Sequence, residues 1–286
     1  MHEMRRQYPV PLLSRVGEVS ARGDDAWRER PPADRAQENA RLEVEIKAAH
    51  TRTRQTCGPE RLQHDLAEHG VHAGVCRIKR LRKKLGIRCT HTKQFTVTTD
   101  SRPTLPVAEN VLDQQFESAA PTRVWVSDIT YIPTDEGWLS LAGHTDLVTG
   151  DIVGSAMGER ITKSLVSQSL CRAVTSKRPL RGLIHHSDRG SQYCSYEYQA
   201  LLGQFAMKAS KSRKGNCDDN APMESFWGTL KQELVHHRRY RTRQEAIQDI
   251  TEYIEVFYNR QRRQARLGFL SPAVYAQRYY AEQLAA

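Results

Sequence analysis

The spacing of apolar side chains divides this chain of 286 residues into two parts. Between about residues 41 and 86, apolar residues recur every three or four positions, a period that predicts helices. These residues are Leu42, Ile46, Ala49, Leu62, Leu66, Val75, Ile78, Leu81 and Leu85. The turn-rich stretch HGVHAG at residues 69–74 separates the last two helices. We therefore predict a helix-turn-helix-like unit here.

Beyond residue 120 the apolar residues alternate with polar ones. In VWVSDITYI (124–132), Val124, Val126, Asp128, Thr130 and Ile132 share one face of a predicted strand. Further strands are predicted at 138–148, 151–157 and 183–188, with helices at 162–176 and 195–205 and a long helical region ending near residue 259. Strands first, then alternating helix and strand, predict a mixed α/β sheet flanked by helices.

These patterns predict four segments. Residues 1–40 form a polar, turn-rich N-terminal segment with one helix-length apolar patch. Residues 41–100 form the helix-turn-helix-like region, and residues 101–120, which include Pro103 and Pro106, form a linker. Residues 121–286 contain the sheet and a C-terminal helical extension.

The charge of the chain is positive and concentrated near its N-terminus. There are 43 Lys and Arg against 33 Asp and Glu, and residues 1–102 carry 21 of the basic and 13 of the acidic side chains. This balance favours a nucleic acid partner. Arg77, Arg80 and Lys84 lie on one face of the last helix of the unit, away from its apolar stripe, where they could meet phosphates or base edges. A solvated basic face on a small helical bundle would explain the same pattern.

Cysteines and hydropathy exclude several classes. The six cysteines form no CxxC pair, which argues against a disulfide framework or a zinc ribbon. No apolar run approaches the length of a membrane span, about 20 residues, and the first residues lack the apolar core of a signal peptide. We therefore expect a soluble, cytoplasmic protein with no membrane partner.

Three carboxylates are candidates for chemistry. Asp128 lies on an otherwise apolar strand face, where an unpaired charge is costly. Asp188 ends its own strand, where open α/β sheets build their sites. Glu224 follows the potential cap residues Asp218, Asp219 and Asn220 at the start of a helix. Such acids can hold two divalent cations about 3.5–4 Å apart, and oxygen ligands favour Mg²⁺ or Mn²⁺. Each acid alone could equally be a helix cap or a surface charge.

The helix that begins near Glu224 has two distinct faces. Phe226, Leu230 and Leu234 form its predicted buried stripe. Lys231 lies about two turns after Glu224 on the other side, so that it could reach a phosphate near the acids. The alternative is an exposed lysine without a function.

Three further residues leave two interpretations open. Asp146 could be a fourth active-site carboxylate or a supporting, structural acid. His186 shares a strand face with Asp188 and could approach the substrate and tune the site, or simply pack, whereas His185 points the other way. Arg262 follows an apolar helix and could contact DNA or pack at the helix terminus.

Four stretches together resemble a known family. WVSDITYI, HHSDRGSQY, DNAPMESFWGTLKQE and YNRQRRQARLGFLSP are similar, in order and spacing, to the orfB transposases of the insertion-sequence-three family, over about residues 8–280. The resemblance implies an RNase H-like, retroviral-integrase-like core. It also implies that Asp128, Asp188 and Glu224, with 35 residues between the last two, are a metal-binding catalytic triad with two Mg²⁺ or Mn²⁺ ions.

The function implied is transposition. Members of this family cleave DNA at the ends of an insertion sequence and join the ends to target DNA, so that the expected partners are DNA, further copies of the chain and an upstream orfA product joined by frameshifting. The expected location is the bacterial cytoplasm, at the nucleoid. A non-catalytic DNA-binding regulator and an RNase H-like nuclease without joining activity are the alternatives. The chain departs from the family pattern at Asp24, Asp25 and Gln264.

Overall fold

The computed structural model describes residues 4, 7–18, 20, 22–23, 25–26, 30–90, 108–112, 120–213 and 217–285. Most of the predicted linker 101–120 and the departure at Asp24 lie outside the described residues. Within them, no helix is long and apolar enough to cross a membrane.

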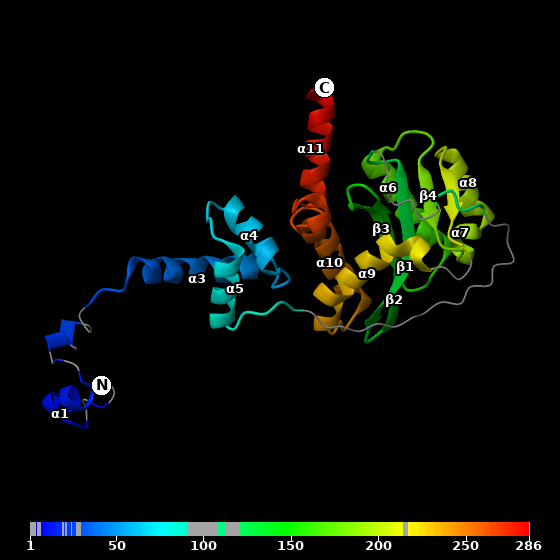
Figure 1. The fold of residues 1–286 in the computed structure, drawn as a ribbon. Coiled ribbons are helices and arrows are strands. Elements are labelled where there is room, and N and C mark those ends of the chain that lie inside the picture. The colour runs from blue at the N-terminus through cyan, green and yellow to red at the C-terminus, as the bar shows by residue number, and fades with distance from the viewer. Residues whose placement is uncertain are drawn as a thin grey trace.

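The N-terminal part is helical and contains its own small core (Figure 1). Helix α1 spans Val10–Val16, α3 spans Asp34–Arg52, α4 spans Pro59–Glu68 and α5 spans Val75–Lys84. Eight residues form the buried core of α3–α5: Leu42, Ile46, Ala49, Cys57, Leu62, Leu66, Ile78 and Leu81. The predicted helical periodicity is confirmed, although α3 begins at Asp34, inside the segment 1–40, because Pro31 and Pro32 directly precede it.

A five-stranded mixed sheet organises the remainder of the chain. Its order is β3-β2-β1-β4-β5, with β1 at Val124–Thr134, β2 at Gly137–Asp146, β3 at Ile152–Gly158, β4 at Ile184–Ser187 and β5 at Lys208–Lys211. The first three strands are antiparallel neighbours, whereas β4 and β5 run parallel to β1. The carboxyl ends of β4 and β5 therefore meet at one edge of the sheet, alongside the middle of β1.

Helices cover both faces of this sheet (Figure 1). One face packs on α9 (Ala221–Glu233), α10 (Arg243–Glu252) and the π-helix η4 (Tyr253–Tyr258). The other packs on α6 (Lys163–Lys177) and α8 (Tyr196–Gln204), with the short α7 (Ser191–Cys194) before α8. The alternation predicted for β1 is confirmed, because Val124, Val126 and Ile132 join the first core while Trp125 joins the second.

Short helical turns complete the chain. These are η2 (Cys217–Asn220), η3 (Val235–His237) and η5 (Ala265–Leu267). Helix α11 (Pro272–Ala285) ends the chain and projects from the body with most of its surface exposed (Figure 1). The predicted long helical region up to residue 259 consists of separate helices, since α9 ends at Glu233 and α10 starts at Arg243.

The helix-turn-helix-like unit contacts the C-terminal helices through side chains. The guanidinium of Arg54 pairs with Glu252 and lies over the Phe257 ring, 4.8 Å from its centroid. The imidazole of His64 stacks on Phe269 with ring centroids 4.2 Å apart. Arg61 reaches Glu233 at 3.8 Å. The two parts therefore meet at a polar, arginine-rich contact.

The edge strand β3 is closed by a side-chain amide. The Asn259 carboxamide accepts the Ile152 N–H at 2.9 Å and donates to the Ile152 carbonyl at 3.0 Å. Farther along the same strand, Arg172 donates to the carbonyl of Ser155 at 2.8 Å. Outward backbone groups of β3 are thus satisfied by side chains rather than by another strand.

Candidate active site

Asp128 projects from β1 toward α9. In the β1–β2 register it lies opposite Gly143, where a Cβ atom would approach the Trp227 ring to 2.9 Å. The missing side chain lets the indole pack against the strand and donate its Nε1–H to Asp128 Oδ2 at 3.1 Å. Burial, helped by the charges of Asp188 and Glu224, raises the pKa of Asp128 to about 7, although the hydrogen bonds from Ile129 and Trp227 act in the opposite direction.

Asp188 follows the last residue of β4. Its Oδ1 accepts the Gly190 N–H at 2.9 Å, which fixes the turn into α7. Burial raises the pKa of Asp188, while the Gly190 hydrogen bond and the charge of Lys211 oppose that rise. Since Ser127 pairs with Ser187 in the sheet, Asp128 and Asp188 both lie one residue beyond the same pair of neighbours.

Glu224 lies in the first turn of α9 and is exposed. Its charge contributes to the raised pKa of Asp128, so that all three predicted acids act on one electrostatic site. Among the described residues, however, no group of three His, Cys, Asp or Glu side chains is already arranged to hold a metal ion. The three acids are neighbours whose oxygens do not yet converge on a point.

The side chains of Asp128 and Asp188 have the chemistry of a divalent-cation site. A carboxylate offers about four lone-pair positions, and the hydrogen bonds from Trp227 to Asp128 and from Gly190 to Asp188 use only part of that capacity. Two acids whose pKa values are both raised, by burial first, are stabilised by a nearby cation. The donor set therefore fits Mg²⁺ or Mn²⁺.

Lys231 lies on the acid side of α9. Its side chain is half-buried, and burial lowers its pKa while the charge of Asp128 acts in the opposite direction. The space at Gly228, between Glu224 and Lys231, is open, because a Cβ atom there would meet no other atom within 4 Å. The arrangement agrees with the predicted polar face of α9, opposite the buried Phe226, Leu230 and Leu234.

Asp146 lies apart from these acids. It pairs with Trp125 in the sheet register, three positions from Asp128 and hence on the opposite face. Its Oδ1 accepts from the backbone of Val148 and Thr149, and its Oδ2 accepts the Thr122 N–H at 2.6 Å. These contacts favour the structural account over a fourth active-site carboxylate.

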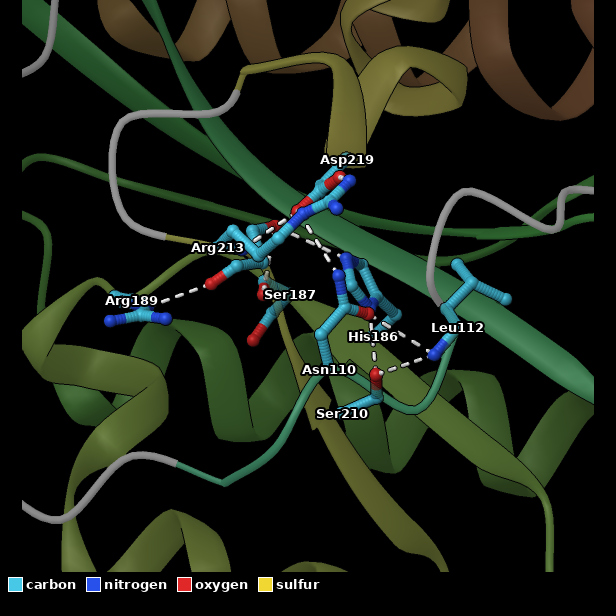
Figure 2. A network of polar contacts seen from close by, with 9 residues as sticks. Asn110, Leu112, His186, Ser187, Arg189, Ser210, Arg213 and Asp219 are labelled. Atoms are coloured by element: carbon cyan, nitrogen blue, oxygen red, sulfur yellow. Dashed lines mark hydrogen bonds and ion pairs between the residues drawn. The ribbon is translucent and has the colours of Figure 1, made fainter.

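His186 belongs to a buried polar network (Figure 2). Its side chain is fully buried, with Nδ1 2.9 Å from Ser210 Oγ and Nε2 3.1 Å from Ser212 Oγ. Burial lowers its pKa to about 4, so that the ring is neutral at physiological pH. These contacts favour packing over an approach of His186 to the substrate, and His185 points to the other face.

The basic residues of α5 are partly neutralised by α3. The Arg77 guanidinium donates to Asn39 at 2.8 Å and to Glu38 at 3.0 Å. The Lys84 ammonium donates to Glu43 at 2.6 Å. Arg80 is exposed and lines a groove between α3 and α5. Of the three predicted DNA contacts, Arg80 is therefore the one whose charge has no acidic partner among the described residues.

Arg262 points inward rather than toward solvent. Its Nε and Nη2 donate to the two carboxylate oxygens of Glu233 at 2.8 and 2.9 Å, and Tyr253 donates its hydroxyl to the same carboxylate at 2.7 Å. The Arg262 side chain is only 11% exposed. These contacts favour the packing account of Arg262 over the DNA-proximal one. The sequence showed a basic residue but not its acidic partner 29 residues earlier.

Two residues of the site, Trp227 and Lys211, were not identified from the sequence. Trp227 was visible as an indole N–H, a group that needs an acceptor when buried, next to the predicted stripe residue Phe226. Lys211 is buried on β5, where its ammonium donates to Ser187 Oγ at 2.7 Å and to the Tyr193 carbonyl at 3.0 Å. Burial lowers its pKa to about 8. Strand β5 has only four residues, too few for alternation to be recognised.

Comparisons with known families agree with this architecture. Residues 118–217 and 224–279 match integrase core domain families, and residues 36–95 match an HTH-like domain family. An acid-bearing mixed sheet after an HTH-like unit defines an integrase-type polynucleotidyl transferase. Among curated relatives, an insertion element IS600 protein of 31 kDa from Shigella sonnei is 54% identical over 94% of this chain and 98% of its own length. The transposase InsF for insertion sequence IS3A of Escherichia coli K12 is 35% identical over 93% of both chains. The chain therefore belongs to the IS3 family of transposases.

Solved structures show a more distant likeness. The HTLV-2 integrase catalytic core in complex with magnesium is 14% identical and covers 56% of this chain and 99% of its own, with a TM-score of 0.45. The BIV integrase catalytic core is 15% identical and covers 57% and 99%, with a TM-score of 0.44. The family assignment depends on the sequence relatives alone.

Proposed function

We propose that the chain is a metal-dependent DDE transposase that cleaves DNA at element ends and transfers the strands to target DNA. The single observation that supports this proposal best is the electrostatic cluster of Asp128, Asp188 and Glu224. Apart from a metal site, an acidic cluster of this kind at the centre of the sheet, beside the carboxyl end of β4, has no evident structural use. A DNA-binding regulator would have no need of it.

In this proposal the three carboxylates bind two Mg²⁺ or Mn²⁺ ions. When bound, the ions supply Lewis-acid stabilisation of the attacking and leaving oxygens during in-line displacement at phosphorus. Asp128 is oriented for this role by the Trp227 indole and Asp188 by the Gly190 N–H. Glu224 completes the set by a change of its side-chain rotamer, since it lies exposed at the start of α9.

Other residues of the chain bind and orient the DNA. Lys231, on the acid side of α9, contacts a phosphate near the scissile bond. The HTH-like unit binds the element end through the exposed Arg80, and Arg77 and Lys84 are released from their α3 partners when DNA competes. The assembly contains more than one copy of the chain and an orfA product or fusion, and it acts at the bacterial nucleoid.

The test is a cleavage and strand-transfer assay with element-end DNA and Mg²⁺. Asp128→Asn, Asp188→Asn and Glu224→Gln should each abolish cleavage and joining, because a ligand is lost, yet leave DNA binding largely intact. Glu197→Gln is the matched control, since Glu197 is an exposed acid that pairs with Lys163 on the outer helices. Joining at the wild-type rate in any of the three variants would overturn the assignment, and cleavage without joined product would indicate a simple nuclease.

A further inference from the structure

Arg189 lies beside the proposed acids but belongs to none of their interactions. It follows Asp188 directly, at the carboxyl end of β4, and its Nε donates to the Ser212 carbonyl at 2.7 Å (Figure 2). Ser212 itself follows β5. The guanidinium is therefore anchored across the carboxyl ends of two parallel strands, at the edge where Asp188 emerges.

The rest of that guanidinium has no partner among the residues that the structure describes. Arginine has five N–H donors in a rigid plane, and the Ser212 bond uses one of them, on Nε. No hydrogen bond or ion pair joins its Nη atoms to any described residue, and the side chain is half-buried. The Arg189 guanidinium is thus held in place by Ser212, while the N–H groups of its Nη atoms are available to a ligand.

The neighbouring Arg213 shows the opposite arrangement. Its Nη2 donates to Asp219 Oδ1 at 2.9 Å, and its backbone N–H and Nε donate to Asp219 Oδ2 (Figure 2). Asp219 also accepts from Asn110, 109 residues away in sequence. Arg213 therefore serves the fold, whereas the charge of Arg189 is not used within the described part of the chain.

Nor does Arg189 neutralise the acid beside it. The Asp188 carboxylate takes its hydrogen bond from Gly190, and the cation that acts on it is Lys211 on β5. A guanidinium with two parallel open N–H groups matches the oxygens of a phosphate, which it binds in a bidentate manner. We propose that Arg189 binds a DNA backbone phosphate next to the scissile one, so that the DNA strand runs over the carboxyl ends of β4 and β5. This inference deepens the proposed function and rests on it for the position of the scissile bond.

The first test measures affinity for an element-end duplex at several salt concentrations, without divalent cations so that the DNA is not cut. Arg189→Met should weaken binding about tenfold and reduce the magnitude of the slope of log affinity against log salt by about 1. Arg189→Lys should restore the slope but only part of the affinity. The matched control is Arg172→Met, an exposed arginine that also donates to one carbonyl but lies at the opposite edge of the sheet. An unchanged slope in Arg189→Met, or an equal change in the control, overturns the proposal.

The second test identifies the phosphate and excludes a merely structural role. A set of duplexes each carries one neutral methylphosphonate near the cleavage point. Wild-type protein should lose affinity at one such position, and Arg189→Met should be insensitive there while remaining sensitive elsewhere. If both proteins lose the same affinity at every position, the phosphate contact is overturned. If Arg189→Met fails to fold, Arg189→Lys takes its place in the test, and a lysine variant that binds with no position-specific loss assigns Arg189 a structural role and also overturns the contact.

The outcomes also separate this inference from the proposed function. If the wild-type protein never cuts or joins DNA but the Arg189-dependent position is found, the proposed function fails and the phosphate contact stands. If the acids prove essential for joining and no Arg189-dependent position exists, the reverse holds. Calorimetric Mn²⁺ binding should be equal in wild type and Arg189→Met, because Arg189 does not contact the carboxylates.

Discussion

Two carboxylates of this protein, the buried Glu233 and the half-buried Asp128, are held in opposite ways. Glu233, at the end of α9, has a side chain that is only 1% exposed, and it accepts two hydrogen bonds from Arg262 and one from Tyr253. Asp128, in the central strand β1, accepts from neutral donors, Trp227 and the Ile129 backbone, and the charges that raise its pKa are two further acids.

The difference separates structure from chemistry. The charge of Glu233 is balanced within the chain, as expected for an ion pair that supports a fold. Among the described residues, no ion pair balances the charge of Asp128, and the acids Asp188 and Glu224 lie near it. Such an arrangement costs stability and persists where a ligand supplies the missing charge. The following experiments would break or sharpen this comparison, from the largest expected effect to the smallest.

Removing Glu233 should cost the most stability. Glu233→Ala leaves the Arg262 guanidinium buried without its acid, which should lower the free energy of unfolding by about 3 kcal/mol. Urea denaturation followed by tryptophan fluorescence measures this loss. Asp128→Asn is the companion variant and should show no loss at pH 8. A comparable loss in both variants would remove the contrast between the two acids.

Divalent cations should stabilise the protein by binding at Asp128 and Asp188, and not at Glu233. At 100 times its dissociation constant, Mn²⁺ should stabilise the wild-type protein by about 2.7 kcal/mol, visible as a higher melting temperature. Asp128→Asn and Asp188→Asn should lose most of this response, because each removes a proposed ligand. The Glu233→Gln variant should keep it, and an undiminished response in the two aspartate variants would place the ion elsewhere.

The pH dependence of stability should follow Asp128. The pKa of Asp128 is raised from 3.8 to about 7 in the folded protein. At a pH between these two values, the folded state therefore keeps a proton on Asp128 that the unfolded state has released. Wild-type stability should therefore fall by about 2 kcal/mol as pH rises from 4 to 7.5, after allowance for partial exposure. Asp128→Asn should flatten that part of the curve. A fall of the same size in the variant would assign it to other groups.

Lys231 should have the smallest effect. Lys231→Ala should reduce the magnitude of the salt slope for end-DNA binding by about 1 and leave Mn²⁺ affinity unchanged. Filter binding and calorimetry measure the two quantities. Lys163→Ala, an exposed lysine on the outer helix α6, is the control. Superimposable salt plots for wild type and Lys231→Ala would reject the phosphate contact.

Features with a regular period could be predicted from the sequence. The core strand β1 was predictable because one of its faces is apolar, and Asp128 was conspicuous because it interrupts that face. The buried stripe of α9 was predictable for the same reason. In both cases the pattern of apolar residues that predicts the feature lies within a short stretch of sequence, a few residues of a strand or a few turns of a helix.

Features that depend on distant partners could not be predicted. Asp219 precedes α9 and looked like a helix cap, but its carboxylate binds Arg213 and Asn110, and the N-cap residue Asn220 makes no side-chain capping bond. Asn220 is thus the N-cap residue, in agreement with the prediction, but it lacks a side-chain cap. The direction of Arg262 similarly depends on Glu233, which lies on another helix. Whether the three acids bind metal, and where the segments begin and end, stay predictions.

The hydrogen bonds between the Asn259 side chain and β3 also affect whether two copies of this chain can pair through their sheets. An exposed edge strand is a template for pairing with a strand of another molecule, and such pairing leads to aggregation. At Ile152 both outward backbone groups are already occupied by Asn259, and the Ser155 carbonyl is occupied by Arg172. A second sheet cannot extend this one here without first displacing those side chains. The proposed assembly of several copies on one DNA molecule is thus compatible with separate sheets. Asn259→Ala should make the protein more prone to precipitate at high concentration.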